Sequence, residues 1–123
     1  ARLGDAWLAE PSLSLARAEE QAQLYADAAA RYGVKAHAAI RRDVYVAETG
    51  AQASLVRDTV TRDGYRGFDP AALMIGTADE IAADMAALET MGYTDVIVRN
   101  LHPDPDHAVA STERLARVRE LLA

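Results

Sequence analysis

The sequence contains no cysteine, and it has only one tryptophan and one phenylalanine. The absence of cysteine excludes disulfide bridges, thiolate catalysis and cysteine-based zinc sites, although it does not identify the cellular compartment. Half of the residues are hydrophobic, and much of that half is alanine. The large core side chains must therefore be mostly Leu, Val, Ile, Met and Tyr. This composition suits alanine-rich helices packed closely on a small sheet.

The sequence also lacks long apolar runs, a recognisable signal peptide and clustered basic residues. Its apolar runs are far shorter than the roughly 20 residues needed to cross a bilayer. No basic stripe interleaved with aromatic residues points to nucleic acid, and no polybasic face points to an anionic membrane. The formal net charge of −6, from 19 acidic and 13 basic residues, mainly indicates solubility. We therefore expect a cytoplasmic protein without nucleic-acid or membrane partners.

Three segments have strand-like patterns, at residues 3–8, 36–47 and 95–99. The last contains the apolar run Val-Ile-Val, which is typical of a parallel strand covered on both sides. The first two are separated by apolar residues at three- and four-residue spacings over 15–32, which predict a helix. Ser12 or Ser14 can cap that helix, and Gly33 fits the left-handed position after its end.

The middle strand has sides of different polarity. Ile40 and Val44 lie on one side, where Arg42 interrupts the apolar pattern, and Arg41 and Asp43 lie on the other. We expect the apolar side to face the helices and the polar side to face the interior of a parallel barrel. An alternative that stays open is that Arg41 and Asp43 simply pair with each other or with neighbours.

Two further segments of the second half have clear local patterns. Residues 51–60 read as a helix, and residues 61–72, with two glycines and a proline, read as a loop that either reaches over a ligand or packs back on the protein. Thr77 and Glu80 have the spacing of a capping box, which predicts a helix that ends at Gly92. A helix start after Gly76 can also hold a phosphate, but a single glycine does not make a phosphate loop.

The last helix is expected to start after residues 100–104 and to bear its cap on Asp104 or Asp106, with Pro105 in its first turn. Strands and helices then alternate along the chain, which predicts a parallel sheet with right-handed crossovers. The fold class is therefore α/β, with three parallel βα units over residues 1–123 in a single, partial domain. The opening residues 1–5 lack an initiator Met and resemble the middle of a domain, so we expect processing, truncation or a fragment.

Four segments carry a family resemblance when taken together: Leu-Gly-Asp-Ala-Trp at 3–7, Arg-Arg-Asp-Val-Tyr-Val at 41–46, Gly-Thr-Ala-Asp-Glu at 76–80, and residues 92–99. In this order they resemble the C-terminal third of luciferase-like flavin-dependent oxidoreductases and monooxygenases. The resemblance implies the last three βα units of a (βα)8 TIM-type barrel that uses FMN or a deazaflavin. The first five strands, which supply most flavin contacts in that family, would be missing, so we expect no cofactor to be bound by this chain alone.

The same resemblance implies a location at the C-terminal rim, where barrel active sites form, for residues 4–7 and 99–102. We take His102 as a catalytic proton donor, because its unperturbed pKa lies near neutrality. Trp7 and Arg99 are taken as cofactor-binding residues, the first against a ring and the second against an anion or a flavin oxygen. The alternatives are that Trp7 belongs to the core, that Arg99 pairs with Asp5 or Asp95, and that His102 is a solvated loop residue.

The two functional hypotheses differ in class. The first is a part of a flavin-dependent oxidoreductase or monooxygenase that acts on an organic small molecule. The second is a non-catalytic fragment that self-associates or complements a missing barrel portion, because three parallel strands leave two open edges. No spacing of the three histidines matches a zinc motif, so no metal site is expected.

Overall fold

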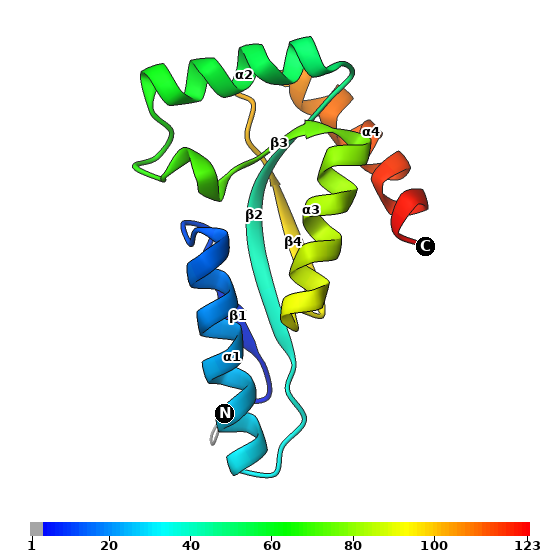
Figure 1. Ribbon diagram of the computed structural model, residues 1–123. Helices are drawn as coiled ribbons and strands as arrows, with labels where there is room; N and C mark the ends of the chain where they lie inside the picture. The colour runs from blue at the N-terminus through cyan, green and yellow to red at the C-terminus, as the bar shows by residue number, and fades with distance from the viewer. Residues whose placement is uncertain (1–3) are drawn as a thin grey trace.

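The computed structural model describes residues 4–123 as an alternation of parallel strands and helices (Figure 1). The elements are, in order, β1 (Trp7–Ala9), α1 (Leu15–Arg31), β2 (Ala38–Ala47), α2 (Gly50–Asp63), the 3-10 turn η1 (Pro70–Ala72), β3 (Met74–Thr77), α3 (Ala78–Met91), β4 (Asp95–Asn100) and α4 (Pro105–Leu122). The expectation for Leu3 lies outside the described residues. This architecture confirms the predicted α/β class and is consistent with part of a (βα)8 barrel.

Strand β2 is the centre of the sheet, and all its pairings are parallel. Residues 38–40 pair with β1 and residues 44–47 pair with β3, while residues 39–44 pair with β4. Ile40 and Val44 each have partners on two strands, so β1 and β3 follow one another along one edge of β2 and β4 occupies the other. The parallel pairing of the second and third predicted strands is therefore confirmed.

Strand β3 was missed by the sequence interpretation, and other boundaries shift by a few residues. Its four residues include Gly76 and run directly into α3, so the segment offers no isolated strand pattern. The first strand begins at Trp7 rather than at residue 3, and α2 extends to Asp63, so it shortens the predicted loop at its start. Pairing with the end of β2, rather than local propensity, makes residues 74–77 a strand.

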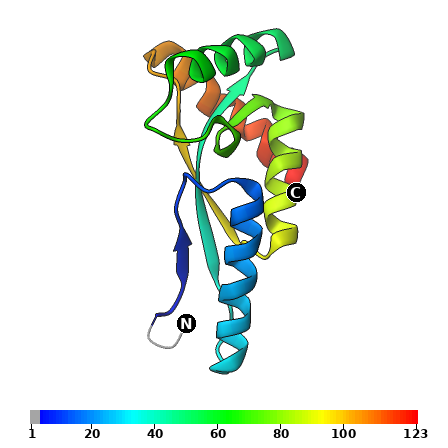
Figure 2. The ribbon, with the colours of Figure 1, turned by 60° about the vertical axis from the view of Figure 1, so that its left-hand side comes forward.

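The apolar side of β2 faces the helices, as predicted. Ile40, Val44 and Val46 are fully buried in one cluster with residues of α1, α3 and α4. Figure 2 shows α1 and α3 on the same side of the strands. Small alanines such as Ala18 and Ala22 let α1 approach the sheet closely, which is the use that the alanine-rich composition suggested.

Arg42 lies on this apolar side and is only 1% exposed. Its Nη1 donates hydrogen bonds to the carbonyl oxygens of Leu13 at 2.6 Å, Pro11 at 3.2 Å and Ala72 at 3.3 Å. Burial lowers the pKa of this guanidinium. Arg42 therefore fastens the connection between β1 and α1, and the turn before β3, to the central strand. The break in the apolar pattern is a structural feature with carbonyl partners.

The opposite side of the sheet is largely uncovered toward the amino ends of the strands. Leu8 of β1 is 58% exposed and Ile97 of β4 is 47% exposed. The prediction that residues 95–98 are covered on both sides is therefore wrong within the described residues, because helices pack only against Val96 and Val98. In a closed barrel this bare side would be the interior.

The helix ends follow the sequence signals closely. The Ser14 hydroxyl accepts from the amide of Arg17, and the Thr77 hydroxyl accepts from the amide of Glu80 at 3.5 Å. Helix α3 ends at Gly92, whose φ of 108° is left-handed. The reciprocal bond of a capping box, from Glu80 back to Thr77, does not occur among the hydrogen bonds of residues 4–123. Only the threonine half of the predicted box is therefore present.

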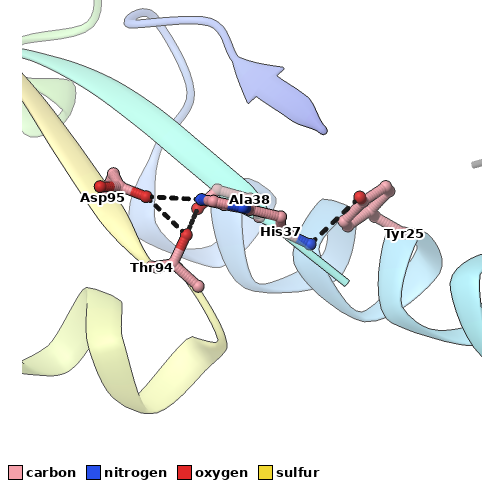
Figure 3. Close-up of polar contacts among 5 residues, drawn as sticks. All are labelled: Tyr25, His37, Ala38, Thr94 and Asp95. Atoms are coloured by element: carbon pink, nitrogen blue, oxygen red, sulfur yellow. Dashed lines mark hydrogen bonds and ion pairs between the residues drawn. The ribbon is translucent and has the colours of Figure 1, made fainter. Parts of the chain in front are cut away.

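Strands β2 and β4 are joined at their amino ends by a polar cluster, drawn in Figure 3. His37 Nε2 lies 2.9 Å from Asp95 Oδ2, and the Thr94 hydroxyl lies 2.7 Å from the same oxygen. The Tyr25 hydroxyl accepts from the amide of His37 at 3.2 Å and so links α1 to this corner. The hydrogen bond from Thr94, followed by that from His37, lowers the pKa of Asp95. The cluster is exposed and lies at the end of the sheet opposite to the cavity described next.

Across the part of the chain that the structure describes, no helix is long and apolar enough to span a membrane.

Candidate functional site

A cavity of about 540 Å³ is lined by α2 and by residues near the carboxyl ends of β2 and β4; Figure 1 shows where these elements meet. One wall is apolar and comes from α2, through Leu55, Val56 and Val60. The opposite wall consists of Tyr45 at the end of β2 and of the β4–α4 connection, including Leu101 and His102. This is the edge of a parallel sheet where ligands bind in barrels, and the size is within the range of small-molecule sites.

Three polar rings gather in the wall of this cavity. The ring of His102 lies 5.1 Å from that of Tyr45 and is stacked on that of His107 at 4.5 Å, measured between ring centroids. The Tyr45 hydroxyl lies 3.2 Å from Nδ1 of His107. Residues far apart in the sequence thus form one aromatic, hydrogen-bonding group, which we call the Tyr45–His102–His107 cluster.

The β4–α4 connection orients His102. Asn100 Oδ1 accepts from the amide of His102 at 3.1 Å, and His102 Nδ1 accepts from the amide of Asp104 at 3.1 Å. A neutral imidazole that accepts at Nδ1 must carry its proton on Nε2. Burial, and then the neighbouring His107, lower the pKa of His102, although Asp104 acts in the opposite direction. His102 is therefore a neutral hydrogen-bond donor through Nε2–H near pH 7.

Tyr45 orients His107 in a similar way. Tyr45 is completely buried, and its hydroxyl has no other hydrogen-bond partner within residues 4–123 than His107 Nδ1. The hydroxyl must therefore donate to Nδ1, since a buried donor without a partner costs about 1–3 kcal/mol. His107 then also carries its proton on Nε2. The cluster presents hydrogen-bond donors in an otherwise mainly apolar cavity.

Sequence reasoning found His102 but missed Tyr45 and His107. The prolines between His102 and His107 argue against a helical pair of metal ligands, so the pattern gives His107 no role, and Tyr45 falls on the polar side of the strand with Arg41 and Asp43. The available signal was that Tyr45 lies near the carboxyl end of a strand, on its interior side. The β4–α4 connection with His102 and His107 follows the carboxyl end of another parallel strand, so the two are expected at the same rim. The described residues contain no group of three or more His, Asp or Glu that could hold a metal.

A second polar group lies on the side of the sheet that faces the cavity, but closer to the amino ends of the strands. The Asp43 carboxylate is fully buried; it accepts from Arg41 Nε at 3.2 Å and from the Tyr65 hydroxyl at 2.6 Å. Burial, followed by the bond to Asp43, raises the pKa of Tyr65 to about 12. The pairing of Arg41 with Asp43 is therefore present. The predicted loop packs back on the protein through Tyr65, whose ring contacts Phe68.

Arg99 lies beside this group and points to the bare side of the sheet. It is the register partner of Asp43 in β4, and its side chain is exposed. Neither Asp5 nor Asp95 forms an ion pair with it within residues 4–123; Asp95 is paired with His37 instead. Arg99 thus lies in β4, three positions before His102 in the sequence, on the side of the sheet that would be the barrel interior.

Trp7 lies elsewhere. It pairs with Ala38 at the amino end of β2, and its ring packs 5.4 Å from that of Tyr25 and 6.0 Å from that of Tyr93. The rim position that the resemblance implied for residues 4–7 is therefore wrong for Trp7. Strand β1 is only three residues long, so it pairs only with residues 38–40, at the amino end of β2.

The cavity does not fit the phosphate of FMN or of a deazaflavin. Asp63 is the one formally charged side chain among its lining residues, and no lysine or arginine is present there to receive a phosphate. The start of α3 is not available either, because a Cβ at Gly76 would lie 2.7 Å from the Glu80 carboxylate, which already occupies that space. The cavity suits an organic molecule, and a phosphate would need positively charged residues that do not line it.

Comparison with known proteins supports the fold. No protein-family model and no curated protein matches the chain. Among the solved structures similar to it is an F420-dependent secondary alcohol dehydrogenase in complex with an F420-acetone adduct, with a TM-score of 0.63 and 15% sequence identity. The alignment covers 96% of this chain and 44% of that enzyme. The chain therefore spans less than half the length of that protein, and at this identity the likeness concerns the fold.

Proposed function

We propose that this chain is the C-terminal part of a flavin- or deazaflavin-dependent oxidoreductase that acts on an organic small molecule. The observation that carries the proposal is the Tyr45–His102–His107 cluster in a cavity at the carboxyl edge of a parallel sheet. The similarity of the fold to an F420-dependent secondary alcohol dehydrogenase supports it. The cofactor would be FMN or a deazaflavin, bound mainly by the rest of the barrel, and it would supply hydride transfer or, in a monooxygenase, oxygen activation.

The residues of this chain would position the substrate and hold a proton. His102 would donate a hydrogen bond from Nε2–H to a substrate oxygen and stabilise the negative charge that develops there, which is the part of a proton donor's role that a neutral imidazole can fill. Arg99 would contact an anionic group or a flavin oxygen from the interior side of the sheet. Trp7 is left out of the site, because its ring packs against Tyr25 and Tyr93 at the other end of β2.

The test is to add an affinity tag after the last residue of this sequence in its natural source and to purify the tagged protein. Its intact mass and visible absorption are then measured. We expect a mass above 13.2 kDa, or a co-purifying barrel portion, together with a flavin or deazaflavin released on denaturation. His102→Phe should retain the cofactor and lose turnover, whereas His37→Phe, altered at the far end of β2, should keep both. A colourless protein with the mass of this chain would refute the proposal.

A second function, as a non-catalytic association module, is favoured by one observation. The interior side of the sheet exposes Leu8 and Ile97, and β1 and β4 each have a single strand partner among the described residues. Titration of the isolated chain with FMN and with a deazaflavin separates the two functions. Under the oxidoreductase proposal a cofactor binds only when the missing portion is added; under the association proposal none binds in either case.

A further inference from the structure

The donors of the cluster define the chemistry that the cavity accepts. His102 Nδ1 is occupied by the amide of Asp104, and His107 Nδ1 is occupied by the hydroxyl of Tyr45. Both rings therefore offer Nε2–H, and neither offers a free acceptor nitrogen. A ligand that only donates hydrogen bonds would find no partner on these rings. A ligand with an acceptor oxygen would satisfy one ring or both.

The charge of the cavity argues against an anion. Asp63 is its one formally charged lining residue and is paired with Arg62, whose Nε lies 2.9 Å from the Asp63 carboxylate, so none of the lining residues offers a positive charge to an anion. Burial and the stacked His107 disfavour the charged form of His102 and lower its pKa, so the His102 ring does not act as a permanent cation. Apolar side chains, among them Leu55, Val60 and Leu101, form much of the remaining wall. These features select an apolar body and an uncharged polar group.

We propose that the cavity binds an uncharged organic molecule through a carbonyl oxygen, which accepts a hydrogen bond from His102 Nε2–H, with His107 as a second donor. This inference deepens the proposed function, on which it rests, by naming the substrate class of the same site. The apolar remainder of the molecule packs against α2. The volume of about 540 Å³ has room for a molecule of more than a few carbon atoms.

The experiment uses three probes of similar shape and the 123-residue chain labelled at histidine. Benzylacetone carries a ketone, hydrocinnamate replaces its methyl ketone by a carboxylate, and butylbenzene lacks an oxygen. The chain has only three histidines, so long-range nitrogen–proton NMR spectra resolve the tautomer of each ring. We expect Nε2–H tautomers for His102 and His107 before addition, and benzylacetone should shift the His102 signals most.

The variants separate hydrogen bonding from shape. His102→Phe keeps a stacked ring but removes the donor, so benzylacetone should bind roughly 3- to 10-fold more weakly while butylbenzene binds equally well. His37→Phe, a matched change at the exposed far end of β2, should alter neither affinity. Tighter binding of hydrocinnamate than of benzylacetone would overturn the proposal, as would equal weakening of both neutral probes in His102→Phe or no binding up to the solubility limit.

The outcome is independent of the test of the proposed function. A natural protein without flavin would refute the oxidoreductase, but it would leave the binding of benzylacetone by this chain as a measurable property. Conversely, a flavin-containing protein whose cavity prefers hydrocinnamate would keep the oxidoreductase and overturn the carbonyl assignment.

Discussion

At the scale of single residues, the buried polar side chains of β2 each have partners from distant parts of the chain. Asp43 is held by the Tyr65 hydroxyl across 22 positions, and Tyr45 bonds His107 across 62 positions. Because an unpaired buried polar group is costly, these partners stabilise one arrangement of the segments that contribute them. The loop before η1 and the start of α4 are therefore fixed over the carboxyl end of β2.

Tyr65→Phe should lower the free energy of unfolding near neutral pH by about 1–3 kcal/mol, because a hydrogen bond to a buried carboxylate is lost. The folded pKa of Tyr65, about 12, lies above the ordinary value of 10.0. The stabilisation is therefore complete below pH 10 and is lost as the pH rises through 12. Urea unfolding at several pH values should show the difference between wild type and variant shrinking over this interval. A constant difference would contradict the assignment, and Tyr32→Phe, at a half-exposed ring, is the control.

Thr77→Ala should lower the free energy of unfolding by about 0.5–2 kcal/mol, because the first turn of α3 loses its cap. The 3.5 Å separation between the hydroxyl and the amide of Glu80 places the expected effect in the lower half of that range. Thr90→Ala in the same helix removes a hydroxyl that bonds only the preceding turn and should change stability by less than about 0.5 kcal/mol. Equal stability of the two variants in urea would show that Thr77 does not cap the helix.

At the scale of elements, β2 organises the chain because each of its portions serves a different neighbour. The pairing of β2 with β4 ends at Val44, and beyond it side chains of α4 take the place of a strand. The Ser111 hydroxyl accepts from the amide of Val46 at 2.8 Å, and Arg114 donates to the carbonyl oxygen of Val46 at 3.0 Å. The final residues of β2 are therefore saturated by β3 on one edge and by α4 side chains on the other. This arrangement brings His107, at the start of α4, beneath α2.

Arg42→Met should loosen two connections at once, because the carbonyl oxygens of Pro11, Leu13 and Ala72 lose their shared donor. We expect a loss of about 1–3 kcal/mol in the free energy of unfolding. Amide hydrogen exchange should become faster in the β1–α1 connection and around η1 before it does so in α3. Arg17→Met, which removes only an exposed ion pair with Glu20, should change stability by less than about 1 kcal/mol. Unchanged exchange around η1 would contradict the role given to Arg42.

At the scale of the whole molecule, the two sides of the sheet differ. One carries α1, α3 and α4 over a continuous apolar cluster, whereas the other, within residues 4–123, is covered only at its carboxyl end, by α2 and the loop after it. The outer edge of β4 and the exposed Ile97 belong to the uncovered portion. A closed parallel barrel of about eight strands would bury this region, and an isolated chain leaves it open.

The isolated chain should therefore self-associate at micromolar concentration, or bind the missing barrel portion if that is supplied. Open strand edges present N–H and C=O groups that pair readily with another chain, and the exposed Leu8 and Ile97 add apolar surface to such a contact. Sedimentation should show species larger than a monomer, and Ile97→Glu on the bare side should reduce them. Leu24→Glu on the exposed face of α1 should not. A monomer with a sharp cooperative melting transition would refute this prediction.

Local physics made much of the architecture predictable from the sequence alone. Apolar spacing identified α1 and the helix-facing side of β2. Short-range capping chemistry predicted the start of α3 at Thr77 and the start of α4 at Asp104 or Asp106, of which Asp104 is the cap. These signals act within a few residues, where the backbone and its nearest side chains determine the conformation. The alternation of elements then implied parallel pairing, because strands separated by helices of this length return in the same direction.

Only the tertiary structure decided which distant residues meet. Strand β3 exists because residues 74–77 pair with the end of β2. Trp7 packs against the core at the other end of the sheet, because its short strand reaches only the beginning of β2. The cluster that joins Tyr45, His102 and His107 depends on contacts across 62 positions, for which one sequence contains no periodic signal. Local pattern therefore specified the elements, whereas the packing of those elements specified the site.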